Sequence, residues 1–177
     1  MEVCASLVAE HDVILHVLDA LEKEAGTVDG GAPVRREFFA SAIAFVREFA
    51  DGVHHKKEEG ILFPRMAEAG VPHEGGPIGV MLYEHDEGRT HIRAMDSALA
   101  KAADGDAPSR QILVRETRGY VALLRAHIMK ENMILFPMAD RVFDPGQRSL
   151  VLEAFTQAEA ADAEITAKRR QWAEGLP

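Results

Sequence analysis

The sequence has little cysteine, few aromatic side chains and no block of basic residues. Cys4 is the single cysteine among 177 residues, which excludes an internal disulfide framework. No apolar run approaches the roughly 20 residues that a membrane helix requires, and no basic segment precedes an apolar run as in a signal peptide. The net charge is -9, without a Lys/Arg cluster. These absences predict a cytoplasmic protein with neither a nucleic-acid nor a membrane partner.

The composition is that of an ordinary globular protein. Hydrophobic residues make up 47% of the chain and charged residues 28%. A chain of 177 residues is long enough to bury one substantial core without disulfide bonds.

Apolar residues recur every three or four positions, as in Leu7, Ile14, Leu18 and Leu21, and no segment alternates with a period of two. This spacing predicts helices rather than strands. Pro64 should kink or end the second predicted helix. We expect helices over residues 3–24, 34–64, 77–103 and 109–137, the last reaching 142 if it passes Pro137, and a fifth over 149–172.

Four long helices joined by short loops predict an all-α, up-down-up-down four-helix bundle. We assign residues 1–143 to this bundle. Residues 144–177 are expected to form an additional C-terminal helix that packs on the bundle within the same domain.

An eleven-residue segment from His54 to Pro64 recurs from His127 to Pro137, with seven identical positions. In each copy a histidine is followed four residues later by a glutamate, Glu58 or Glu131. A spacing of four places both side chains on one face of a helix. Each pair can therefore hold a metal ion.

A second repeat lies ahead of the first, where Glu10-His11-Asp12 returns as Glu84-His85-Asp86. A lone histidine on an apolar helix face usually packs in the core, and a lone His-x3-Glu is often a surface pair. Six such residues in repeated order favour a dinuclear metal site, because burying them without a partner would cost several kcal/mol. The candidate ligands are His11, His54, Glu58, His85, His127 and Glu131.

With these motifs, residues 5–143 resemble the hemerythrin-like family in its cation-binding form, which has a His-His-Glu set in each half. The resemblance implies a non-haem centre of two iron ions, with an oxo or hydroxo bridge, held by the six candidate ligands. Imidazole and carboxylate donors also suit manganese or zinc.

The sequence departs from two branches of that family. Oxygen-carrying hemerythrins have a further histidine where this chain has Arg89, and an aspartate where it has Glu131, which argues against an oxygen-carrier role. The branch that repairs damaged iron centres carries an extra N-terminal cysteine-containing domain. We do not expect that domain here, because the sequence enters its first helix almost at once.

Several neighbouring residues have two interpretations. His55 is either a seventh metal ligand or an outer hydrogen-bond partner. Tyr120 shares a helix face with His127, so it either packs in the core or lines a pocket. Gly88 leaves room one turn after His85 for a close helix contact or a small ligand. The sequence does not assign the partners that orient the imidazoles; Asp12, Asp86 and Glu87 are candidates, while Glu59 is either such a partner or exposed.

The residues indicate a dinuclear metal site and the resemblance implies iron; together they favour a di-iron protein that binds or senses O2, NO or peroxide, or that handles iron. Neutral imidazoles stabilise the ferrous state better than carboxylates do, which supports ligand binding over strongly oxidising chemistry. Two alternatives stay open: a di-iron enzyme that reduces peroxide or NO, and a helical interaction scaffold with a structural metal site. The expected partner is a small diatomic ligand or peroxide, and a homodimer stays open.

Overall fold

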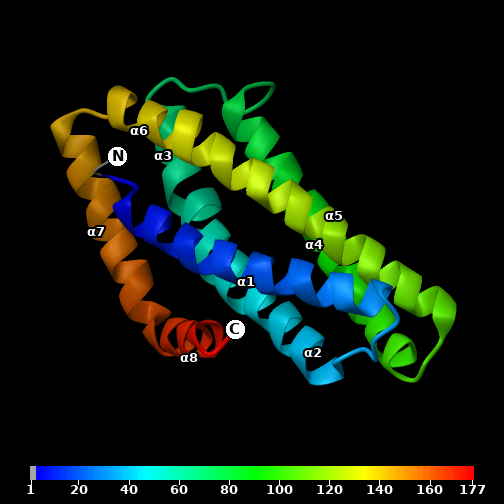
Figure 1. Cartoon of the computed structure of the whole chain (residues 1–177). Helices are drawn as coiled ribbons and strands as arrows, with labels where there is room; N and C mark the ends of the chain where they lie inside the picture. The colour runs from blue at the N-terminus through cyan, green and yellow to red at the C-terminus, as the bar shows by residue number, and fades with distance from the viewer. Residues whose placement is uncertain (1–2) are drawn as a thin grey trace.

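The computed structural model describes residues 3–177, which form helices and connecting turns without a strand. Four long helical rods run antiparallel to one another, and two shorter helices lie across one side of them (Figure 1). This architecture confirms the expected all-α, up-down-up-down bundle. Within the described residues, no helix is long and apolar enough to span a membrane.

The first rod is α1 (Ala5–Asp29), which is longer than expected. The loop predicted from Gly26 was wrong, since the helix continues through this glycine and ends before Gly31, whose φ is 98°. Ala25 and Val28 are buried in the core. Their burial outweighs the helix-propensity cost of Gly26, which is about 1 kcal/mol relative to alanine.

The second rod is one continuous helix made of α2 (Arg36–Phe45), η1 (Val46–His55), η2 (Glu58–Leu62) and α3 (Phe63–Glu68). The η segments are π-helical. Pro64 was expected to kink or end this helix, but the chain stays helical to Glu68. The Phe63 N–H bonds to the Glu58 carbonyl, five residues back. Pro64 has no N–H and cannot make the hydrogen bond that an α-helix requires to the carbonyl four residues earlier. The π turn before it does not use that hydrogen bond, so the helix continues.

The third rod is α4 (Pro77–Ala103), which has the expected bounds. The fourth combines α5 (Ala107–Lys130), η3 (Glu131–Leu135) and α6 (Phe136–Val142). The Phe136 N–H bonds to the Glu131 carbonyl. The sequence repeat is therefore also a structural repeat: both halves have a π turn at the glutamate and remain helical past the proline.

The C-terminal segment forms two helices, α7 (Pro145–Ala161) and α8 (Ala163–Glu174). The single helix predicted over 149–172 was wrong, because the chain bends at Asp162. There Asp162 accepts a hydrogen bond of 2.8 Å from Lys56 Nζ on the second rod. The bend lets α7 and α8 contact different parts of the bundle.

Two apolar clusters fill the interior, and α7 and α8 each contribute to one of them. Phe155 of α7 is buried in the cluster at the end of the bundle that holds Leu7 and Phe136. Ala173 of α8 belongs to the larger cluster toward the opposite end. Between the clusters lies a layer of buried histidines and carboxylates, to which all four rods contribute.

Candidate metal centre

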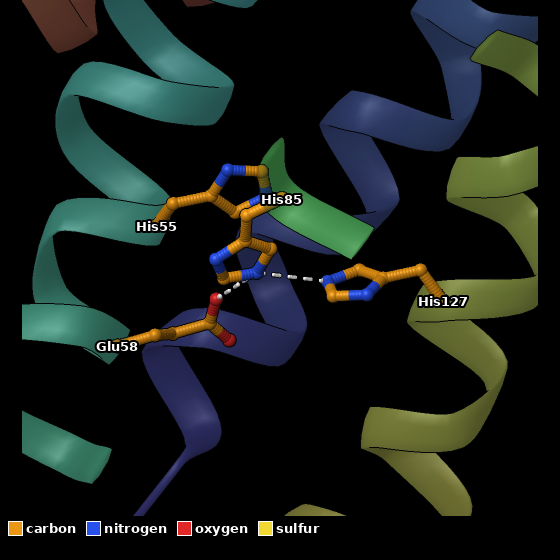
Figure 2. Close-up of side chains that lie close together, drawn as sticks. All are labelled: His55, Glu58, His85 and His127. Carbon is orange, nitrogen blue, oxygen red and sulfur yellow. Dashed lines mark hydrogen bonds and ion pairs between the residues drawn. The ribbon is translucent and has the colours of Figure 1, made fainter. Parts of the chain in front are cut away.

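The six repeated residues meet in this polar layer. His11 comes from α1, His85 from α4, and the two His-x3-Glu pairs come from the second and fourth rods. Each of the six side chains is at most 1% exposed. Figure 2 shows four residues of the layer: Glu58, His85 and His127 point toward one another, and His55 lies over His85.

The imidazoles are arranged as two pairs. His11 Nε2 and His54 Nε2 are 3.0 Å apart, and His85 Nε2 and His127 Nε2 are 3.1 Å apart. Each pair combines one histidine from each of two repeated motifs. Two atoms that ligate one ion at about 2.1 Å and at right angles are themselves about 3 Å apart. Both spacings fit one ion per pair.

The two glutamates lie between the pairs. Glu131 Oε2 is 3.1 Å from His11 Nε2, and its Oε1 is 3.2 Å from His127 Nε2. Glu58 Oε1 is 3.5 Å from His54 Nε2, and its Oε2 is 3.5 Å from His85 Nε2. Each carboxylate therefore presents one oxygen to each imidazole pair, an arrangement that suits bridging of two ions.

His55 breaks the symmetry of the two halves. Its ring stacks on that of His85, with centroids 3.7 Å apart, and it forms a group suited to a metal ion with Glu58, His85 and His127. The other group consists of His11, His54, Glu58 and Glu131. The repeat places Ile128 where the second half would have a counterpart of His55. One half can thus offer one imidazole more than the other.

In each imidazole, Nδ1, the ring nitrogen that faces away from the centre, makes a hydrogen bond. Nδ1 of His54, His127 and His85 donates to a carboxylate oxygen of Glu10, Glu84 and Glu59, over 2.9, 2.9 and 2.7 Å respectively. His11 Nδ1 donates to Asn132 Oδ1 over 3.0 Å, and His55 Nδ1 donates to Asp51 Oδ1 over 3.3 Å.

An ionised carboxylate only accepts hydrogen bonds, so these contacts place the imidazole proton on Nδ1. The lone pair of each Nε2 is left for the centre of the site. In the two pairs, facing lone pairs at 3.0 and 3.1 Å repel unless a cation lies against them.

The four glutamate oxygens also need a cation. Imidazole nitrogens approach them, but without hydrogen-bond geometry, and neither oxygen of Glu58 or Glu131 has a hydrogen-bond partner among residues 3–177. A buried carboxylate without a hydrogen bond or a counterion is strongly unfavourable. Imidazole and carboxylate donors around such a centre fit a pair of divalent metal ions.

The pKa shifts follow from burial and from the charges in the layer. Burial, together with the neighbouring Glu131, holds the pKa of Glu58 well above its usual range. At Glu131 burial acts in the same direction, but the His127 and His11 imidazoles outweigh it and lower the pKa. Burial also depresses the pKa of His54 and His55, which keeps both neutral. Neutral imidazole is the form that binds metals.

Two lysines complete the outer hydrogen-bond network, again in a repeated arrangement. Lys57 Nζ lies 2.7 Å from Glu10, whose other oxygen accepts from His54. Lys130 pairs in the same way with Glu84, the partner of His127. Lys57 is buried and also reaches Glu159 of α7 at 3.0 Å, whereas Lys130 is partly exposed.

The candidate outer partners Asp12, Asp86 and Glu87 do not take that role, because all three side chains are exposed. The glutamate of each Glu-His-Asp repeat takes that role instead, and it contacts a histidine on a neighbouring rod. Of the two interpretations of Glu59, the structure supports the outer partner, since it binds His85. The sequence contained one indication of this outer hydrogen-bond network: the aligned repeats have a lysine at the same position, Lys57 in one and Lys130 in the other.

The remaining histidines lie outside the centre. His16 and His73 are exposed, and His91 donates to Glu116 over 2.8 Å. Cys4 is buried in the apolar cluster with Leu7, and burial raises the pKa of its thiol.

A family model, the hemerythrin HHE cation-binding domain, matches residues 3–139. The chain belongs to this family. The match spans all four rods and all seven candidate ligands, and it places the chain among metal-binding proteins.

The similar curated proteins are more distant. Uncharacterised proteins of Mycobacterium tuberculosis and Mycobacterium bovis are 24% identical over 157 residues, 86% of this chain and 59% of theirs. Iron-sulfur cluster repair proteins YtfE of Musicola paradisiaca and Dickeya chrysanthemi are 36% identical over 92 residues and 33% over 90 residues. These two matches cover 50% of this chain and 40% and 41% of those proteins. The chain thus spans less than two thirds of these relatives, and no solved structure matches it.

Proposed function

We propose that this protein holds two iron ions in the polar layer, one against His11 and His54 and the other against His85, His127 and His55. Glu58 and Glu131 bridge the two positions. The observation that carries this proposal is the set of four buried carboxylate oxygens without a hydrogen-bond partner among the described residues, surrounded by imidazoles whose Nδ1 atoms are all engaged.

Iron is favoured over manganese and zinc by the similarity to two relatives and not by the donor set. The donors combine five imidazoles with two carboxylates, a borderline set that suits all three metals. The Musicola and Dickeya relatives are iron-sulfur cluster repair proteins, which associates similar proteins with iron.

The function that this centre supports is the binding or sensing of O2, NO or peroxide. When bound, a pair of iron ions supplies reversible redox chemistry and a coordination position for such a ligand. The residues of the chain fix the imidazoles through their Nδ1 hydrogen bonds and hold the bridging carboxylates away from water, and burial keeps His54 and His55 neutral.

Iron handling is a second candidate, because the similarity to the repair proteins covers half of the chain. The two functions differ in how firmly the metal is held. A sensor retains its iron when a competing acceptor is added, whereas a protein that delivers iron releases it.

The test is an optical titration of iron-loaded protein that is first reduced without oxygen and then exposed separately to O2, NO and peroxide. A spectral change that reverses when the ligand or oxidant is removed, with the iron retained against a chelator, supports binding or sensing. Transfer of the iron to an apo iron-sulfur acceptor supports iron handling. Repeated consumption of peroxide or NO with a reductant would contradict both and identify an enzyme, and a chain that takes up no iron would leave the scaffold alternative.

A further inference from the structure

A groove of about 260 Å³ lies between the start of α4 and η3, at the surface of the second half of the bundle. Its wall consists of Pro77, Val80, Met81, Lys130, Ile134 and Leu135. Met81 and Leu135 are buried, whereas Val80 is 46% and Ile134 50% exposed. The groove therefore has an apolar floor and apolar rims that are open to solvent.

Exposed apolar side chains gather on the two segments that form this groove. Within residues 3–177, seven large apolar side chains are exposed, and five of them lie in residues 80–83 and 129–134: Val80, Tyr83, Met129, Met133 and Ile134. Single apolar side chains on a surface are ordinary, but a group of them marks an interaction site. Methionine is common on such surfaces because its flexible side chain adapts to a partner.

The internal repeat indicates what kind of partner fits. The offsets of 74 and 73 residues that relate the two halves give every residue of the wall a counterpart in the first half. These counterparts lie at or next to the starts of α1 and η2: Val3, Ser6, Leu7, Lys57, Ile61 and Leu62. An equivalent groove thus exists on the first half.

In the first half this groove is filled by α7, which contacts η2 and passes the N-terminal end of α1 (Figure 1). Val151 and Phe155 of α7 are buried in the apolar cluster that contains Leu7. Glu159 of α7 lies 3.0 Å from Lys57 Nζ. The three α7 residues follow one another at intervals of four, so they lie on one face of the helix.

The second half has no such helix within the described residues. Between α3 and α4 the chain runs through residues 69–76, which form turns. The lysines show the difference: Lys57 pairs with Glu10 and Glu159 and is 1% exposed in its side chain. Among residues 3–177 Lys130 pairs with Glu84 alone, and its side chain is 31% exposed.

We propose that the groove on the second half binds an amphipathic helix of a partner protein, seated as α7 is on the first half. An aromatic side chain enters the groove, an apolar residue four positions earlier packs beside it, and a carboxylate four positions later pairs with Lys130. Recognition of a helix by an apolar groove uses anchors with this spacing. The carboxylate supplies Lys130 with the second acidic partner that Lys57 already has.

The probe is a fluorescent peptide with the sequence of α7, residues 145–161, titrated with the full-length protein and followed by fluorescence anisotropy. A free helix of this length is marginal in water. A lactam bridge between positions 153 and 157, made in a Gln157→Lys peptide, keeps it helical, and both positions are exposed on α7. We expect saturation below about 1 mM protein. A peptide with Phe155→Ala should bind at least about tenfold more weakly.

Ile134→Asp and Val80→Asp place a charge on the rims of the groove, and each should weaken binding of the peptide at least about tenfold. Leu150→Asp is the matched control, since Leu150 is 51% exposed and lies outside the groove, and it should leave the Kd unchanged. Circular dichroism establishes that the three variants fold. A peptide with Glu159→Gln should bind the wild type about threefold more weakly but should bind Lys130→Met as the unchanged peptide does.

Absence of saturation, or equal binding of the peptide by Ile134→Asp and the wild type, would overturn the proposal. Light scattering tests the other occupant, a second copy of this chain. We expect a monomer, and a dimer that Ile134→Asp dissociates would assign the groove to the second copy and overturn the partner helix. Binding of the peptide does not require iron, so its failure would leave the proposed function intact, and a chain without iron would leave the groove assignment intact.

Discussion

The two bridging glutamates are the residues in which stability and metal binding conflict most strongly. Glu58 and Glu131 are fully buried, and without a cation burial and the neighbouring Glu131 raise the pKa of Glu58, so the metal-free fold bears the cost of protonating this side chain. The ionised form of both side chains is what two divalent ions require. A change at one of these residues should therefore affect the metal-free and metal-loaded proteins in opposite directions.

Glu58→Gln tests this conflict. Glutamine is neutral without taking up a proton, so the substitution removes the cost of protonating Glu58 and should raise the melting temperature of the metal-free protein by about 2–6 °C, corresponding to roughly 1–2 kcal/mol. The iron content should fall below two per chain. Calorimetry and elemental analysis measure the two effects, with the exposed Glu68→Gln as the control. A variant that loads two irons as the wild type does would show that Glu58 is not a bridge.

The lysines behind the imidazoles provide a matched pair of substitutions. Lys57 is 1% exposed in its side chain and lies between Glu10 and Glu159, whereas Lys130 is 31% exposed. Lys57→Met leaves the buried Glu10 without a cation and should destabilise the fold by about 3–5 kcal/mol, while Lys130→Met should cost less than about 1 kcal/mol. Equal losses in urea denaturation would contradict the assignment of Lys57 as a buried partner.

At the residue scale the sequence predicted the candidate ligands, because residues able to bind a metal recur in it with the same spacing. Six candidate ligands were selected by their repeated spacing, and the structure brings all six together with His55. The partners of the imidazoles were not predicted, because Glu10 and Glu84 act across helices. A helical spacing shows which residues share a face, but not which face of a neighbouring helix they meet.

At the scale of elements, the notable feature is the π-helical geometry around the ligands. The η1 segment contains His54 and His55, and η2 and η3 begin at Glu58 and Glu131. Widened turns of this kind often occur at functional sites. Here they coincide with two adjacent buried histidines, His54 and His55, and with helices that run past Pro64 and Pro137.

Alanine substitutions at two glycines of the second rod distinguish the effect of the π-helical backbone from that of helix propensity. A Cβ atom on Gly52 would lie 3.0 Å from the Arg47 carbonyl oxygen, five residues back, whereas one on Gly60 meets nothing within 4 Å. Gly60→Ala should therefore stabilise the protein by about 1 kcal/mol, and Gly52→Ala should destabilise it. Thermal unfolding of both variants checks the prediction, and stabilisation by both would argue against a π turn at Gly52.

No sequence pattern predicted the π turns. The π turns coincide with the buried ligands. Pro64 was interpreted as a kink or an end of its helix, whereas continuation of the fourth helix past Pro137 was left open. The bend at Asp162 was not predicted either, and the contact there joins Asp162 to Lys56, 106 positions away in the sequence.

At the scale of the whole molecule, the centre lies between two apolar clusters and beneath a C-terminal pair of helices. Phe155 of α7 packs in one cluster and lies over Lys57, with the ammonium 5.6 Å from the ring centroid. Trp172 of α8 packs on Phe45 with ring centroids 5.7 Å apart. We propose that residues 144–177 form a single domain with the bundle and close one side of the outer hydrogen-bond network.

Phe155→Ala tests this proposal against its exposed neighbour Leu152→Ala. Removing the buried ring should cost about 3–4 kcal/mol, while Leu152, 43% exposed, should cost much less. If the chain is one domain, circular dichroism should show a single transition at lower temperature, with iron lost in the same transition. A separate early transition that leaves the iron bound would indicate that α7 and α8 form an independent unit.

The presence of two iron ions is the central claim, and anomalous X-ray diffraction at the iron absorption edge tests it most directly. The account predicts two peaks per chain in crystals of iron-loaded protein, one beside His11 and His54 and the other beside His55, His85 and His127, with Glu58 and Glu131 between them. A single peak, peaks away from these residues, or a signal at the zinc edge alone would contradict it.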